Sequence, residues 1–419
     1  MLVALVLVAG LAAVGLSACG GDEESGGSTE LSFFIFNEPS GVLPTIANRC
    51  SKQSGGEYTI TFEYLPSDAD QQREQLVRRL GAEDSSIDIM GMDVIWTGEF
   101  ANAGWVEQWS GENETAATQG VFPSVTETAR FEEKLWAAPI WSNTQLLWYR
   151  TDRVKKPPKT WDEMFKQSAQ IGEEGLIQVQ ANRYEGLVVW FNAMVESAGT
   201  SIVSPEDAGQ VALEPAATER ALSLMVELAL SEAADPAQST SDEDTSRLSF
   251  EEGTSSFMLN YPFVYPSAEA EAPEVFKNLG QAPYPRVDAN EPSAPPLGGI
   301  NLGVSSFSEN KDEAFDAIKC MIQPANQIEV ATAGGLPPVL ESLYDDKEID
   351  KVYPGFAQLI RQAIDAAAPR PVTPAYQDLS LAIQRTIHPL EDIPPDDIAG
   401  TVDELRDNVQ KALDVEGLL

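Results

Sequence analysis

Polar and aromatic side chains stand where the predicted strands and helices end, and their types suit one kind of ligand. Carboxylate, amide and guanidinium groups form the two-pronged hydrogen bonds that pairs of hydroxyls require. Flat aromatic rings pack against C–H faces and lose little conformational entropy. The candidates share this position at element ends: Asn37, Glu38, Asp93, Asn143, Gln145, Tyr261, Gly335 and Arg370. The combination indicates a site for a neutral, hydroxyl-rich molecule such as a sugar.

Each candidate also has a purely structural interpretation. Asn143 would cap a turn, and Tyr261 would belong to the core. The pair Gly334–Gly335 would only end a helix. Asp93 and Arg370 would form an ion pair within the fold. The residue types alone leave both interpretations open.

The elements that must position these residues begin with an alternation of strand and helix. The pattern predicts strands at Leu31–Phe36, Tyr58–Leu65 and Ile87–Ile95, with helices at Pro44–Lys52 and Gln71–Leu80 between them. A further helix is expected through Phe100 and Trp105. This order predicts a parallel sheet covered by helices, with ligands at the carboxyl ends of the strands.

The following segment predicts a second unit of the same α/β class. Two apolar runs, Leu135–Ile140 and Leu146–Tyr149, mark the crossing, and Thr160-x-x-Glu163 is a capping box for the next helix. Strands are expected at Leu176–Gln180, Phe257–Asn260 and, returning to the first unit, Ile300–Val304. Further helices are predicted at 184–198, 217–230, 241–252, 310–322, 325–332, 356–366, 375–388 and 397–414.

The fold class expected from this order is α/β with two lobes, each a helix-flanked sheet, joined by hinge strands. The N-terminal lobe takes residues 31–140 plus about 300–345. The C-terminal lobe, with helices packed at the hinge, takes 141–299 plus about 346–419. A ligand cleft between the lobes, able to close by hinge motion, follows from this arrangement.

The start of the chain has the pattern of a bacterial lipoprotein signal. An apolar stretch ends in Leu16–Cys19, with a Gly, Ser and acidic run after it. We expect residues 1–18 to be the signal peptide, Cys19 to carry the lipid, and 19–30 to be a flexible tether. The alternative is a signal anchor, although the apolar run falls short of the ~20 residues that a span needs. The predicted location is the outer face of the plasma membrane.

Net charge excludes two classes of partner. The 419 residues include 66 Asp and Glu against 27 Lys and Arg, which gives a formal charge of −39. Nucleic acids and anionic bilayers bind proteins through basic patches, so neither is an expected partner. The lipid is therefore the predicted contact with the membrane.

Cysteine usage predicts one disulfide. Once Cys19 is lipidated, Cys50 and Cys320 remain as a pair in an oxidising compartment, and we expect them to join two helices of one lobe. Two isolated cysteines and the single histidine, His388, make a poor metal site. No metal and no cofactor are predicted.

Signatures of catalysis are absent from the sequence. It contains no Gly-x-Ser-x-Gly, no His-Glu-x-x-His and no phosphate-binding loop ending in Lys-Ser/Thr. A secreted glycosidase that uses paired carboxylates is the alternative from another class. A structural cell-wall lipoprotein is a third interpretation.

Several long strings resemble the sugar-binding proteins of ABC importers, the maltose-binding-protein-like class, and within it mycobacterial trehalose-binding lipoproteins. The strings are spread over the chain: Asp93–Thr97, Asn143–Arg150, Gln180–Asn182, Glu185–Asn192, Gly334–Pro337, Arg370–Pro371 and Tyr376–Gln377. Cys50 and Cys320 also stand where that family carries cysteines. The resemblance implies the two-lobed periplasmic-binding-protein fold, type II.

The resemblance also implies binding without catalysis and a set of contacts. A disaccharide, trehalose first and maltose or another α-glucoside second, would bind between the lobes and pass to permease subunits driven by a cytoplasmic ATPase. The protein would be a monomer. The family's sugar-contacting positions match Gln72, Asp93, Asn143, Glu243, Gly335 and Arg370. Tyr261 replaces the family's stacking tryptophan, and Asn37 and Glu38 lie in a loop that differs from the family.

Overall fold

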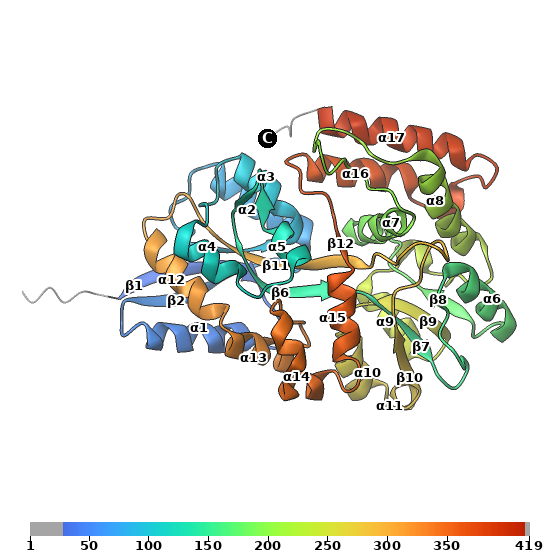
Figure 1. Ribbon diagram of the computed structural model, residues 1–419, viewed down its shortest axis with the longest axis horizontal. Helices are drawn as coiled ribbons and strands as arrows, with labels where there is room; N and C mark the ends of the chain where they lie inside the picture. The colour runs from blue at the N-terminus through green and yellow to red at the C-terminus, as the bar shows by residue number, and fades with distance from the viewer. Residues whose placement is uncertain (1–27, 415–419) are drawn as a thin grey trace, which may run out of the picture.

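Two separate β-sheets with helices around them form the molecule (Figure 1). The computed structural model describes residues 28–414. The predicted signal peptide, Cys19 and all but the last residues of the predicted tether lie outside this range. The two sheets agree with the expected α/β class, while the exact boundaries of the lobes stay a prediction.

The first sheet has the order β12-β11-β3-β1-β2, with β6 also paired to β11. Its strands are β1 (Thr29–Phe36), β2 (Tyr58–Leu65), β3 (Ile89–Asp93), β6 (Ala138–Thr144), β11 (Pro296–Val304) and β12 (Ala368–Pro369). β1 is parallel to β2 and to β3, as predicted. β11 returns antiparallel to β3, which confirms the predicted return strand.

The second sheet has the order β10-β7-β9-β8. Its strands are β7 (Leu146–Arg150), β8 (Leu176–Gln178), β9 (Ser255–Asn260) and β10 (Leu279–Ala282), and a separate hairpin pairs β4 (Arg130–Phe131) with β5 (Lys134–Leu135). Because β6 and β7 lie on either side of Gln145, the chain crosses between the sheets at that residue. β10 was not predicted from the sequence.

Helices cover both sheets, and the long ones match the predictions within a few residues. Those predicted are α1 (Val42–Gln53), α2 (Ala69–Leu80), α3 (Thr97–Asn102), α6 (Trp161–Ile171), α7 (Glu185–Ser197), α8 (Pro215–Leu230), α9 (Glu243–Glu251), α12 (Lys311–Met321), α13 (Pro324–Gly334), α15 (Ala357–Asp365), α16 (Tyr376–Ile387) and α17 (Ile398–Asp414). Five were missed: α4 (Gly111–Thr118), α5 (Pro123–Thr128), α10 (Val264–Glu271), α11 (Pro273–Phe276) and α14 (Lys347–Val352). All five are short.

Local hydrogen bonds fix two element ends that bear on the site. The third strand was predicted to run to Ile95, but it ends at Asp93, because the Asp93 carboxylate accepts the Ile95 N–H at 3.2 Å and starts a 3₁₀ turn. Thr160 caps α6 as predicted, accepting the Glu163 N–H at 3.1 Å. The Glu163 carboxylate accepts from Lys159 N–H instead of completing the capping box.

Helices α14 and α15 lie where the two sheets approach each other (Figure 1). α15 contacts α5 and β6, and α14 contacts α13. Phe356, just before α15, packs its ring against Trp148 of β7 and Tyr265 of α10. Elements of both sheets therefore share one apolar cluster at this junction.

The predicted disulfide is present between α1 and α12. Cys50 and Cys320 are joined with their Cα atoms 5.8 Å apart, and both helices pack beside the first sheet. The sequence pattern therefore identified the pair and its lobe. Across residues 28–414, none of the helices combines the length and apolar character required to cross a membrane.

Candidate functional site

Asp93 and Arg370 meet at one edge of the first sheet. β11 pairs with β6 along one edge and with β3 and β12, one after the other, along the opposite edge, so the ends of β3 and β12 are held near each other. The Arg370 Nη2 donates to Asp93 Oδ1 at 3.3 Å. Arg370 is only 6% exposed. The ion pair that the structural interpretation expected is therefore present, and it is buried on the arginine side.

A second carboxylate, Glu185, holds the other end of the guanidinium. Arg370 Nη1 donates to Glu185 Oε1 at 2.5 Å. Glu185 is the first residue of α7, where the helix dipole favours a negative charge. The hydroxyls of Tyr376 and Ser380, both on α16, donate to its two oxygens at 2.5 and 2.6 Å.

The sequence reasoning missed Glu185 as a site residue. A signal was available, because Glu185 is the one charged residue before the apolar run Gly186–Phe191 of a helix whose side chains are almost all buried. Burial raises the pKa of the Glu185 carboxyl, while the Arg370 charge and the Ser380 and Tyr376 hydroxyls lower it.

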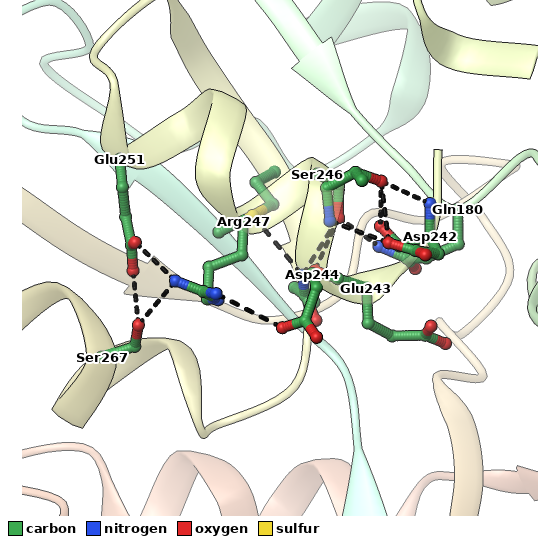
Figure 2. A network of polar contacts seen from close by, with 11 residues as sticks. Gln180, Asp242, Glu243, Asp244, Ser246, Arg247, Glu251 and Ser267 are labelled. Carbon is green, nitrogen blue, oxygen red and sulfur yellow. Dashed lines mark hydrogen bonds and ion pairs between the residues drawn. The ribbon is translucent and has the colours of Figure 1, made fainter. Parts of the chain in front are cut away.

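The structure distinguishes Glu243 from the acidic residues on either side of it. Asp242 caps α9 by accepting the Thr245 N–H at 2.8 Å, and Asp244 pairs with Arg247 at 3.3 Å. Glu243 extends away from both contacts (Figure 2). Its Oε2 accepts the Tyr184 hydroxyl at 2.8 Å. Of the three consecutive acids, Glu243 is therefore the one whose carboxylate neither caps α9 nor pairs with Arg247.

Tyr261 follows β9 and is held at its backbone. Asn260 Oδ1 accepts the Tyr261 N–H at 2.8 Å, and Asn260 Nδ2 donates to the Glu243 carbonyl at 2.9 Å. Burial raises the pKa of the Tyr261 phenol, and the charge of Glu243 raises it further, while Arg370 opposes and Asp93 adds to the shift. The phenol thus lies in the electrostatic field of three predicted site residues.

Burial also raises the pKa of the Glu243 carboxyl, against the hydrogen bond from Tyr184. Four predicted residues, Asp93, Arg370, Glu243 and Tyr261, are consequently grouped by contacts or by charge. They come from β3, the segment after β12, α9 and the end of β9. The group joins the first sheet with elements of the second.

Gly335 lies at a contact between elements of different sheets. It ends α13 in the left-handed conformation, with φ of 64°, which confirms that the glycine pair terminates a helix. A Cβ added there would stand 3.4 Å from Pro266 Cγ on α10. Glu38 is a neighbour, since a Cβ on Gly334 would lie 3.1 Å from Glu38 Oε1.

Four of the remaining predicted residues make no hydrogen bond to the Arg370 group within residues 28–414: Glu38, Gln72, Asn143 and Asn37. Glu38 accepts from Ser40, through the Ser40 N–H at 3.0 Å and through its hydroxyl. Gln72 is buried on α2 and donates to the Ser67 carbonyl at 3.1 Å. Asn143 lies on β6 opposite Gly298, and Asn37 is exposed. A binding role for these four stays a prediction.

Gln145, at the crossing point, is buried in a polar chain behind β9. Its Nε2 donates to Gln180 Oε1 at 2.8 Å, and Gln180 Nε2 donates to the Leu259 carbonyl at 2.9 Å. These bonds fix the strand that leads to Tyr261. No group of three or more His, Cys, Asp or Glu in the described part of the chain is arranged to hold a metal ion.

Comparison with known proteins identifies the family of this chain. Residues 45–356 match the family of bacterial extracellular solute-binding proteins. The chain belongs to this family. Its members bind solutes outside the cell, so the chain is an exported binding protein and not an enzyme. The glycosidase interpretation is therefore set aside.

Two relatives of this solute-binding protein span much of its length. The probable ABC transporter-binding protein of Deinococcus radiodurans is 29% identical over 345 residues, 78% of this chain and 79% of the relative. The maltotriose-binding protein of Pyrococcus abyssi is 27% identical over 278 residues, 64% of this chain and 58% of the relative.

Solved structures show the same two-lobed fold. Maltose-bound MalE3 of T. maritima has a TM-score of 0.80 at 24% identity, covering 92% of this chain and 99% of its own. The Thermus thermophilus maltotriose binding protein, bound with maltotriose, has a TM-score of 0.71 at 21% identity, covering 91% and 99%. The solute-binding protein therefore has the periplasmic-binding-protein fold that the sequence predicted.

Proposed function

We propose that this protein is the substrate-binding lipoprotein of an ABC importer for a disaccharide, with trehalose as the favoured ligand. It captures the sugar between its lobes and delivers it to permease subunits driven by a cytoplasmic ATPase. A lipid on Cys19 holds it at the outer face of the plasma membrane. The family membership and the relative described as an ABC transporter-binding protein support the importer.

The observation that carries the proposal is the buried Arg370 between Asp93 and Glu185, with Tyr261 in the same field. A guanidinium, carboxylates and a phenol are the groups that hydroxyl pairs and sugar faces require. Maltose is the second candidate, because two of the similar proteins are described as bound to maltose or maltotriose. Trehalose is favoured by the longer sequence strings that resemble trehalose-binding lipoproteins.

A thermal-shift screen tests the ligand. We expect trehalose to raise Tm more than maltose, sucrose or glucose does, because a ligand that binds only the folded state stabilises it by mass action. At 100 times Kd the stabilisation is about 2.7 kcal/mol. A larger shift with maltose would reassign the sugar. A panel in which no saccharide moves Tm would contradict the proposal.

We also expect the lobes to close on the sugar. Two contacts between elements of different sheets would separate on opening: Gln377 Nε2 of α16 with Asp70 Oδ1 of α2, at 3.3 Å, and Gly335 with Pro266. Small-angle scattering should give a smaller radius of gyration with saturating trehalose than without it. Equal radii in the two states would show that binding does not depend on a hinge.

A further inference from the structure

Both oxygens of the Glu185 carboxylate already accept hydrogen bonds from protein side chains. Oε1 accepts from Arg370 and Tyr376, and Oε2 accepts from Ser380, whose own hydroxyl oxygen accepts from Gln384 at 3.0 Å. A carboxylate surrounded by donors from three side chains is fixed in place. It therefore acts on the guanidinium and not directly on a bound molecule.

Arg370 has the opposite arrangement, because one of its three nitrogens has no hydrogen-bond partner in the described part of the chain. Nη1 and Nη2 bond to Glu185 and Asp93, while the buried Nε–H has no partner among residues 28–414. A buried donor without an acceptor costs about 1–3 kcal/mol. A hydroxyl or a water is the kind of group that would satisfy it.

The charges around the guanidinium exceed its own. Arg370 carries one positive charge at any working pH, and Asp93 and Glu185 bond to it directly. Glu243 is a third carboxyl nearby, because its charge acts on the Tyr261 phenol together with the charges of Arg370 and Asp93. An arginine in this surrounding offers hydrogen-bond donors without a net positive field, so an anion gains little from approaching it.

We propose that Glu185 is the specificity-determining residue of the site: it fixes Arg370 and, together with Asp93, outweighs its charge, so that the protein takes uncharged glycosides and rejects anions. The inference rests on the proposed function and narrows the substrate class to neutral sugars. Sugar phosphates and uronic acids are excluded by charge and not by shape.

Calorimetric titration of the full chain with trehalose, with and without inorganic phosphate at constant ionic strength, tests this. Phosphate is small enough to enter wherever a sugar does. In Glu185→Gln the amide keeps the shape and can still bond Arg370, Tyr376 and Ser380, but the charge is lost. We expect trehalose affinity to fall at least fivefold, and to fall further in phosphate, whereas the unmodified protein is insensitive to phosphate.

Two further variants separate charge from shape. Glu196→Gln removes another acid of α7, one whose pKa burial also raises, and should match the unmodified protein in both buffers. Ser380→Ala keeps the Glu185 charge but loosens its hold, so we expect roughly two- to threefold weaker trehalose binding and no phosphate sensitivity.

Three results would overturn the inference. One is wild-type affinity in Glu185→Gln without phosphate sensitivity. Another is a loss of affinity that phosphate does not deepen, which would leave Glu185 a structural role only. If Glu185→Gln fails to fold, unchanged affinity in Ser380→Ala contradicts the positioning. An unmodified protein that binds no sugar would instead refute the proposed function.

Discussion

Arg370→Ala should abolish sugar binding and also lower stability. The substitution removes the donors proposed to meet the ligand, and it leaves Asp93 and Glu185 without their shared counter-charge. Removing one partner of a buried ion pair typically costs about 3–5 kcal/mol. We expect trehalose Kd to weaken more than ~100-fold by calorimetry, a loss of more than about 2.7 kcal/mol. Tm should fall measurably in the same preparation.

A second arginine provides the control. Arg361 on α15 forms a half-exposed pair with Glu341 at 3.4 Å, and surface pairs contribute about 0–1 kcal/mol. Arg361→Ala should leave both affinity and Tm close to the unmodified values. Near-native trehalose affinity in Arg370→Ala would show that the sugar binds elsewhere.

The first sheet was predictable because each of its first three strands has a local sequence pattern. Apolar runs identify β1 and β3, and an alternating run identifies β2, with helical segments between them. β10 and α10 gave weaker signals. β10 is only four residues long, and α10 contains Pro266 and lacks a clear apolar face, so neither stands out from a loop in sequence.

The partners of the predicted site residues were harder to predict. Arg370 lies 185 positions from Glu185 and 277 from Asp93, and no local pattern reports which carboxylate a distant arginine selects. The choice of Glu243 among three consecutive acids came from resemblance. Its physical reason, the use of Asp242 as the helix cap, is visible only in the hydrogen bonds.

Glu38 shows how a local hydrogen bond engages a predicted residue, whose binding role stays a prediction. Its place after β1 suggested a ligand contact, but the Pro39–Ser40 turn lets the side chain bond its own neighbour, the Ser40 N–H. Short-range bonds of this kind compete with any contact to a ligand.

The double variant Cys50→Ala/Cys320→Ala should destabilise the protein and leave binding intact. The bond closes a segment of 270 positions, for which chain entropy gives a bound of about 5.6 kcal/mol, and removing a native disulfide typically costs about 2–5 kcal/mol. Tm should fall by roughly 3–6 °C by calorimetry. Trehalose Kd should stay within about twofold, because the bond joins α1 and α12 and the Arg370 group uses neither helix.

Reduction supplies the matched control for this variant. Cys50 is fully buried, whereas Cys320 is half-buried, so a reductant can reach the bond from the Cys320 side. A thiol reagent should lower Tm of the unmodified protein toward that of the double variant and should not change the variant itself. If the variant keeps its Tm, the packing of α1 against α12 and α13 alone holds this part of the fold together. If its trehalose affinity falls together with Tm, the disulfide holds the first sheet in the shape that brings Asp93 to Arg370.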